Sequence, residues 1–148
     1  MDDTASLTRT SLRPRFCETD QMGIVHHASY LIYFEAARVE WLRRRGVDFA
    51  EWSRRGVNVA VVDANVQYRS AAFFDDELVI ETRLSELRSA SIRFAYRLVR
   101  GDTLIAEGGT RLAWVNAERK LQRIPSDIRE TLSSPERRDE IASKLARV

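Results

Sequence analysis

The chain has 148 residues, a length that fits one domain built on a single hydrophobic core. Its 44% hydrophobic and 31% charged residues are typical of a soluble globular protein, and the net charge of only +2 gives no support to nucleic-acid binding. A single cysteine, Cys17, excludes an intrachain disulfide and is typical of a reducing compartment. Without a signal-peptide pattern or a long apolar run, the sequence predicts a cytoplasmic protein and no membrane insertion.

The N-terminal part predicts a loose tail over the first eight residues and a short strand over residues 12–19. Apolar residues alternate along one face of that strand. Because Pro14 has no N–H to donate, we expect either that this strand lies at a sheet edge or that Pro14 stands at the start of the strand. Residues 19–23 then break the alternation and predict a loop.

A long helix is predicted over residues 28–45. Apolar residues recur there at helical spacing and form a wide surface, so the helix should be mostly buried. Residues 43–45 are arginines and Gly46 follows, a combination that suits the negative end of a helix dipole and a left-handed cap. Asp48 is expected to cap a second, short helix that ends at Gly56.

After Gly56 the apolar residues alternate, which predicts strands. The alternation slips by one residue, and we therefore expect a β-bulge near Val61. Three further alternating runs cover residues 78–84, 92–98 and 104–114. The pair Gly108-Gly109 inside the last run indicates sharp curvature or the close approach of another backbone.

The C-terminal part predicts a short strand at residues 120–124, a helix capped by Ser126 and a charged helical tail after Pro135. One long helix followed by four or five antiparallel strands predicts an α+β fold in which a sheet packs on a helix. We expect one domain over residues 1–148, with a core at about 10–125. A single helix leaves strand edges uncovered, so a homodimer is expected.

The loop before the long helix holds the residues that point to chemistry. It brings an acid, Asp20, a glycine, Gly23, and two histidines to the start of a buried helix. A helix start offers unpaired N–H groups and a partial positive charge, which can stabilise a developing oxyanion. A carboxylate beside such donors is the minimum required to hydrolyse an activated acyl group.

This loop resembles the signature of the 4-hydroxybenzoyl-CoA thioesterase family, and most closely the Tol-Pal-associated branch of acyl-CoA thioesterases. The family pattern D-x-D-x-x-G-x-V followed by H-x-x-Y corresponds to Glu18-Thr19-Asp20-Gln21-Met22-Gly23-Ile24-Val25 and His27-Ala28-Ser29-Tyr30. Glu18 departs mildly from the first aspartate of the pattern. The resemblance covers about residues 13–125. It implies the hotdog fold, a curved antiparallel sheet around one long central helix, and dimers, often assembled as tetramers, with active sites at the dimer interface.

The resemblance assigns Asp20 as the catalytic carboxylate, which attacks the thioester carbon or activates a water molecule. The alternative is that Asp20 only caps the following helix. Gly23 allows a close approach or a positive φ. The His27 N–H corresponds to the family's oxyanion donor. Its imidazole could orient Asp20 or the water, or could be a hydrogen-bonded, half-buried side chain.

Other polar residues of this region are given structural interpretations. His26 receives no role, and no metal site is expected because adjacent histidines point apart and a third ligand is missing. Glu35 is interpreted as an ion-pair partner for Arg38. Cys17, without an activating base, is interpreted as a packed small apolar residue on the predicted strand.

Coenzyme A carries phosphates, which arginine binds well. By resemblance, Arg88 with Ser91 occupies the segment that contacts the nucleotide end, and Arg69 is a further candidate. A solvated surface charge is the alternative for each arginine. Tyr30 is one of several aromatic residues that could line an aryl or an aliphatic acyl pocket.

The sequence thus predicts an enzyme that hydrolyses an acyl-CoA thioester to a free acid and coenzyme A, without a metal or an organic cofactor. Two alternatives remain open. One is release of an acyl chain from an acyl carrier protein, and the other is a non-catalytic hotdog protein that binds acyl-CoA.

Overall fold

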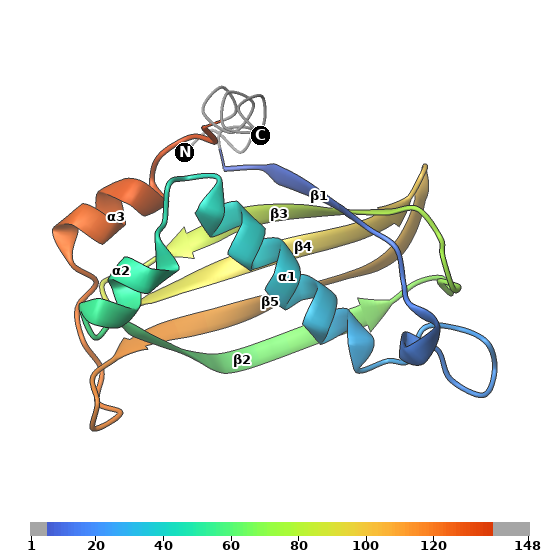
Figure 1. Ribbon diagram of the computed structural model, residues 1–148, viewed down its shortest axis with the longest axis horizontal. Coiled ribbons are helices and arrows are strands. Elements are labelled where there is room, and N and C mark those ends of the chain that lie inside the picture. Colours follow the sequence, from blue (N-terminus) through green and yellow to red (C-terminus); the bar gives the residue numbers. More distant parts are fainter. Residues whose placement is uncertain (1–5, 138–148) are drawn as a thin grey trace.

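The computed structural model describes residues 6–137. Its centre is a five-stranded antiparallel sheet in the order β1-β3-β4-β5-β2 (Figure 1). The strands are β1 (Thr8–Leu12), β2 (Asn58–Tyr68), β3 (Leu78–Leu87), β4 (Ser91–Arg100) and β5 (Thr103–Val115). The helices are the single 3-10 turn η1 (Phe16–Glu18), α1 (Ser29–Arg43), α2 (Phe49–Arg54) and α3 (Ser126–Leu132).

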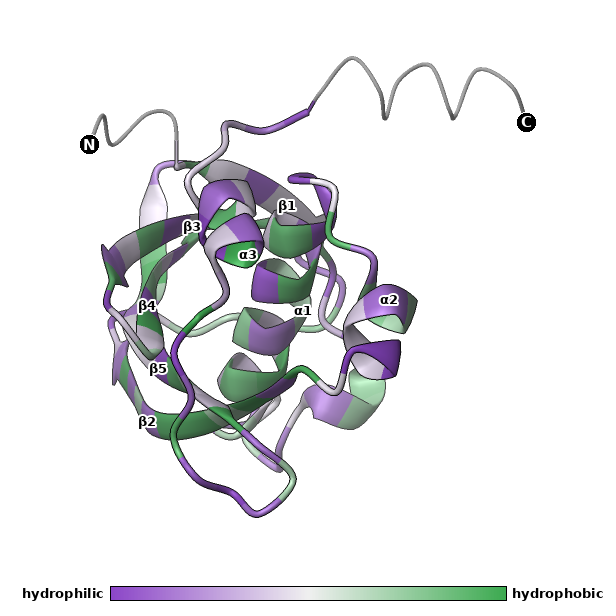
Figure 2. Ribbon diagram, turned by 90° about the vertical axis from the view of Figure 1, so that its left-hand side faces the viewer, coloured by the Kyte–Doolittle hydropathy of each residue, from purple (hydrophilic) through white to green (hydrophobic). Residues whose placement is uncertain are grey.

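The sheet curves around α1, with β1 at one rim and β2 at the other (Figure 2). The predicted α+β class and hotdog arrangement are therefore confirmed. Helix α1 begins one residue later and ends two residues earlier than expected, at Ser29 and Arg43. Gly46 has the predicted left-handed conformation, with φ 84°. Asp48 caps α2, because its side chain accepts hydrogen bonds from the main-chain N–H groups of Ala50 and Glu51.

The buried face of α1 follows from the helical spacing of its large side chains. The residues buried there are Ser29, Tyr30, Tyr33, Phe34, Ala37, Trp41 and Leu42. Phe34 stacks on Tyr96 of β4 with ring centroids 4.3 Å apart, and Trp41 meets Phe94 edge to face at 5.1 Å. Aromatic pairs of this kind add about 0.5–1.5 kcal/mol each beyond the burial of their area. These contacts fix α1 across the concave face of the sheet.

The irregularities of β2 and β5 also follow the sequence. The register between these strands shifts between Val61 and Asp63, which confirms the predicted bulge. A Cβ atom at Gly108 would lie 2.1 Å from the main-chain oxygen of Asn65, and one at Gly109 would lie 2.9 Å from that of Phe94. The glycine pair therefore permits the close approach of the two neighbouring strands, as expected.

The strand predicted over residues 12–19 is wrong. β1 ends at the first residue of this segment, and the chain then turns through Pro14 into η1. The Glu18 carboxylate accepts a hydrogen bond from the Arg15 main-chain N–H at 2.6 Å, which closes the turn. An alternating apolar pattern could not reveal this bond, because it concerns only which residues face the core.

Two further expectations for the N-terminal part are wrong. Cys17 is exposed, because η1 directs it away from the core. Of the tail expected over the first eight residues, residues 1–5 lie outside the described residues, and Ser6 is buried. The Trp41 indole donates a hydrogen bond to the Ser6 carbonyl at 2.6 Å, and Thr8 belongs to β1.

The segment after β5 contributes more to the core than expected. Residues 120–124 form no strand, and only an isolated bridge joins Leu121 to Val115. Ser126 is the first residue of α3 rather than its cap, a position that Pro125 occupies. Ile128 and Leu132 are buried in the core, so α3 closes one end of it.

The helical tail expected after Pro135 lies mostly in residues 138–148, outside the described residues. None of the helices within residues 6–137 is long and apolar enough to cross a membrane.

Candidate active site

The loop of residues 19–28 joins η1 to α1 and forms one wall of a cavity. Its tight turn is closed by hydrogen bonds from Asp20 N to Ile24 O at 2.8 Å and from Gly23 N to Asp20 O at 2.9 Å. Gly23 has φ 79°, a left-handed conformation that favours glycine. The Val25 N–H donates to the Ala72 carbonyl at 2.8 Å and so ties the loop to the segment after β2.

Glu18 anchors the start of this loop, a role that the sequence did not reveal. Its carboxylate is buried and accepts hydrogen bonds from the Arg15 N–H at 2.6 Å and from the Tyr33 hydroxyl at 3.0 Å. Burial opposes the charge on Glu18, but the hydrogen bonds from Arg15 and Tyr33 outweigh it and hold the pKa of the carboxyl below its ordinary value. Its carbonyl accepts from the His26 N–H at 2.8 Å.

Asp20 lies at a cavity of about 370 Å³ between the loop, the start of α1 and the end of β2. One carboxylate oxygen accepts a hydrogen bond from the Met22 N–H at 2.8 Å, which holds the side chain in an Asx turn. Among the described residues no donor is found for its other oxygen. Asp20 does not cap α1, whose N-cap is Ala28, so the helix-cap alternative is wrong.

His27 lines the same cavity as Asp20. Its main-chain N–H donates no hydrogen bond within residues 6–137, whereas the N–H of Ala28, the N-cap of α1, donates to the His26 imidazole at 3.1 Å. The His27 carbonyl accepts from the Tyr68 hydroxyl at 2.8 Å, which links the loop to β2. The imidazole is exposed and lies against that of His26, with ring centroids 4.1 Å apart. The cavity therefore combines a held carboxylate with an unused main-chain donor.

The structure brings some of the predicted substrate-binding residues to this cavity and leaves others apart. Tyr30 and Arg69 line it with Asp20. Arg69 forms an ion pair with Glu107 at 2.9 Å. Arg88 lies in the β3–β4 turn and Ser91 begins β4, at the opposite end of the sheet (Figure 1). Within one chain, they cannot contact a ligand that is held only in the Asp20 cavity.

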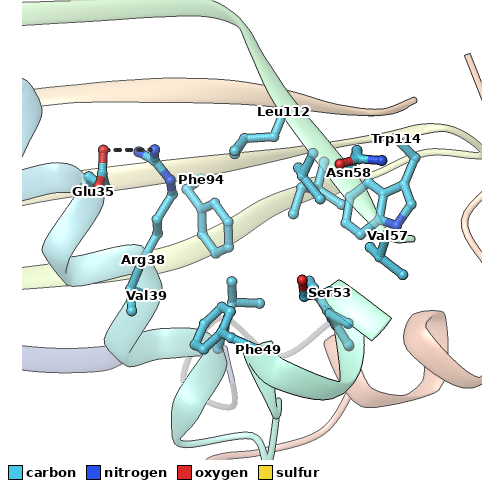
Figure 3. Close-up of a pocket in the computed structure, with 14 residues that line it drawn as sticks. Glu35, Arg38, Val39, Phe49, Ser53, Val57, Asn58, Phe94, Leu112 and Trp114 are labelled. Atoms are coloured by element: carbon cyan, nitrogen blue, oxygen red, sulfur yellow. Dashed lines mark ion pairs between the residues drawn. The ribbon is translucent and has the colours of Figure 1, made fainter. Parts of the chain in front are cut away.

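A second cavity of about 370 Å³ lies between α1, α2 and the concave face of the sheet (Figure 3). Its walls are mostly apolar, and its lining residues are Glu35, Arg38, Val39, Leu42, Phe49, Trp52, Ser53, Val57, Asn58, Val59, Ile92, Phe94, Leu112 and Trp114. The predicted pairing of Glu35 with Arg38 is confirmed, with a distance of 3.8 Å between Arg38 Nη2 and Glu35 Oε2. An apolar cavity with few polar groups is typical of a small-molecule site.

Among residues 6–137 no group of three histidine, cysteine, aspartate or glutamate side chains is placed to hold a metal ion.

Comparison with known proteins identifies the family. The family model of the thioesterase-like superfamily matches residues 14–132. The chain belongs to this superfamily. The predicted family and the predicted enzyme class, a thioester hydrolase, are thereby confirmed.

Relatives support the same assignment. The acyl-CoA thioesterase YbgC of Haemophilus influenzae is 33% identical over 71% of this chain and 78% of its own. A structure of a hypothetical protein from Thermus thermophilus is 41% identical, with a TM-score of 0.80 over 86% of this chain and 95% of that one. The 4-hydroxybenzoyl-CoA thioesterase of Pseudomonas sp. strain CBS-3 shares the fold, at 23% identity and a TM-score of 0.77 over 86% of this chain and 99% of that one.

Proposed function

We propose that this protein hydrolyses an acyl-CoA thioester to a free carboxylic acid and coenzyme A, with Asp20 as the catalytic carboxylate. The observation that carries the proposal is the position of Asp20 in a cavity beside the unused N–H of His27. The similarity to the Haemophilus acyl-CoA thioesterase supports coenzyme A as the carrier of the acyl group.

Two routes use the same ionised carboxylate. In the first, Asp20 attacks the thioester carbon, the thiolate of coenzyme A leaves, and water then hydrolyses the mixed anhydride. In the second, Asp20 takes a proton from a water molecule that attacks the same carbon, and the C–S bond breaks with departure of the thiolate of coenzyme A. Both routes place negative charge on the thioester oxygen, where the His27 N–H and the start of α1 can stabilise it.

The neighbouring residues have supporting roles in this proposal. Gly23 permits the turn that exposes Asp20, and the Tyr68 hydroxyl fixes the His27 carbonyl at 2.8 Å and with it the adjacent main chain. Tyr30 is buried and lines the cavity, where its ring can pack on the thioester. Arg69 stands at the same cavity and offers a positive charge to the phosphates of coenzyme A.

The protein is proposed to act as a homodimer joined along β2. This strand lies at the edge of the sheet and pairs only with β5 among the described strands. Val61 and Val62, at its middle, are 49% and 56% exposed. An antiparallel pair of β2 strands would bury these side chains near a two-fold axis and remove the free edge.

This pairing gives the second cavity a role. Antiparallel alignment places the Tyr68 end of one β2 beside the Val57–Val59 end of the other. The Asp20 cavity of one subunit then adjoins the apolar cavity of its partner, where Val57 and Val59 form part of the lining. The acyl group is proposed to enter that apolar cavity. Arg88 and Ser91 can contact the nucleotide end only from a neighbouring subunit, in the dimer or in a tetramer.

The test measures release of free thiol from matched CoA and carrier-protein thioesters by the wild-type enzyme. Hydrolysis of the CoA thioesters at a higher kcat/KM supports the proposal. A preference for the carrier-protein thioesters would assign the enzyme to acyl-carrier-protein release instead. Binding of acyl-CoA without any thiol release would identify a non-catalytic binding protein.

A further inference from the structure

Arg38 is a mostly buried cation on the wall of the apolar cavity. Its side chain is 12% exposed and extends from α1 beside Phe94 toward Glu35 (Figure 3). Transfer of a charge to such a place is unfavourable unless opposite charge or good hydrogen bonds compensate for it. A buried guanidinium at a cavity wall therefore requires an explanation.

The compensation that Arg38 receives within the described chain is weak. Among the described residues it forms an ion pair with Glu35, at 3.8 Å, and the Glu35 side chain is 67% exposed. The carboxylate thus stays mostly in solvent while the guanidinium faces the interior. The Tyr96 hydroxyl, which interacts with Arg38, also shares a hydrogen bond with the Thr110 hydroxyl at 2.6 Å.

The positive charge of Arg38 also affects the pKa of Tyr96. Burial raises the pKa of Tyr96, while the hydrogen bond with Thr110 and the charge and hydrogen bond of Arg38 act in the opposite direction. One donor of the cavity lining lacks an acceptor, since Trp114 is buried and its indole nitrogen has no hydrogen-bond partner among the described residues. The cavity wall thus holds a guanidinium and an unpaired indole N–H, while its only carboxylate among the described residues, that of Glu35, lies mostly in solvent.

We propose that the apolar cavity selects acyl groups that carry a carboxylate at their far end, and that the Arg38 guanidinium binds this carboxylate. Arginine suits this task because its planar fork makes two parallel hydrogen bonds to a carboxylate. The aromatic walls formed by Phe49, Trp52 and Phe94 hold the hydrocarbon part of the same group. The substrate class is therefore the mono-CoA thioesters of dicarboxylic acids. This inference rests on the proposed acyl-CoA hydrolysis.

The experiment compares two pairs of CoA thioesters that differ in the distal carboxylate, hexanoyl-CoA with adipoyl-CoA and benzoyl-CoA with 4-carboxybenzoyl-CoA. For the wild-type enzyme we expect kcat/KM to favour the carboxylate-bearing member of at least one pair by about 10-fold or more, as a charge-assisted bond in a desolvated site implies. Arg38→Met, which keeps the length and apolar stem of the side chain, should bring that ratio to about one or below.

Glu35→Gln is the matched variant. It removes the one acid that competes for Arg38, so the preference for the carboxylate should rise. Arg38→Lys keeps the charge but loses the fork, and should retain part of the preference. Circular-dichroism melting of each variant checks folding. If Arg38→Met does not fold, the carboxylate preference should still rise in Glu35→Gln and fall in Arg38→Lys. A preference unchanged in both variants would overturn the inference.

A wild-type preference for the hydrocarbon member of both pairs would overturn the inference, as would an Arg38→Met variant that keeps the carboxylate preference. Preference for 6-hydroxyhexanoyl-CoA, lost in Glu35→Gln but kept in Arg38→Met, would assign recognition to Glu35 and a hydroxyl group. Dissociation constants of adipoyl-CoA and hexanoyl-CoA, measured by calorimetry in an Asp20→Asn background, provide a readout without turnover. If the wild type hydrolyses no CoA thioester, the proposed function fails, and this binding comparison alone decides the role of Arg38.

Discussion

Replacement of Glu18 by Gln tests how the loop of residues 19–28 is held. The wild-type carboxylate accepts hydrogen bonds from the Arg15 N–H at 2.6 Å and the Tyr33 hydroxyl at 3.0 Å. Hydrogen bonds to a charged group contribute about 1.5–3 kcal/mol each, and a glutamine of the same shape keeps a neutral version of them. We therefore expect Glu18→Gln to lower the free energy of unfolding by about 1–3 kcal/mol at pH 7.

The pH dependence identifies the cause. The folded-state pKa of Glu18 is held below its ordinary value, so its stabilising contribution is fully present above the unfolded-state pKa. That contribution is lost as the pH falls through the folded-state pKa, because the wild-type carboxyl then becomes neutral as well. The difference between wild type and Glu18→Gln should therefore shrink at acidic pH.

The assay is urea denaturation followed by tryptophan fluorescence at several pH values, with the slope of the unfolding free energy checked for constancy. Glu77→Gln is the matched control, since the Glu77 side chain is 81% exposed in its ion pair with Arg13 and should change stability by no more than about 0.5 kcal/mol. A Glu18→Gln variant as stable as wild type at pH 7, or one whose deficit stays constant with pH, would refute this reasoning.

Two further predictions concern the edge strand β2. Tyr68→Phe removes the 2.8 Å hydrogen bond to the His27 carbonyl, and we expect kcat to fall about 10-fold with a loss of stability of at most ~1.5 kcal/mol; an unchanged kcat in steady-state kinetics would argue against a positioning role. The double substitution Val61→Lys and Val62→Lys places four like charges near the proposed two-fold axis, so sedimentation should show dissociation to monomers together with loss of activity. Ser11→Lys, on the opposite sheet edge, should remain dimeric. Equal dimerisation of the wild type, the double lysine variant and Ser11→Lys would rule out pairing along β2.

Periodicity predicted the parts of the fold that depend on local pattern. The spacing of Tyr30, Phe34 and Trp41 predicted the buried face of α1, because residues three or four positions apart lie on the same face of a helix. The one-residue slip of alternation near Val61 predicted the bulge, because one extra residue in a strand moves the following side chains to the opposite face of the sheet.

The residues that periodicity misread are those with partners far along the chain. Arg45 was interpreted as one of three charges that complement the end of α1, yet it is fully buried. Its guanidinium lies 3.6 Å from the Trp41 ring centroid and donates to the Thr8 hydroxyl at 2.8 Å and to the Ser134 carbonyl at 3.0 Å. Burial lowers the pKa of Arg45 to about 10. No local pattern encodes contacts with both ends of the described chain.

The candidate site shows the same division. Asp20, Gly23 and His27 were found because they stand close together in one loop, and Tyr30 follows within the same motif. Glu18 was noted only as a departure from the family pattern, although its carboxylate fixes that loop to α1 through Tyr33. Arg88 and Ser91 lie at the far end of the sheet, and their proposed contact with the nucleotide depends on an assembly that one sequence does not describe.

The central claim is that the Asp20 carboxylate performs the chemistry, and Asp20→Asn tests it most directly. Asparagine keeps the shape of the side chain and can still accept the hydrogen bond from the Met22 N–H, so the loop should remain intact. With the acyl-CoA that the wild type hydrolyses best, we expect kcat to fall by about 10²–10⁴-fold or more while the dissociation constant of that acyl-CoA changes little. Thiol release by Asp20→Asn at the wild-type rate would contradict the account.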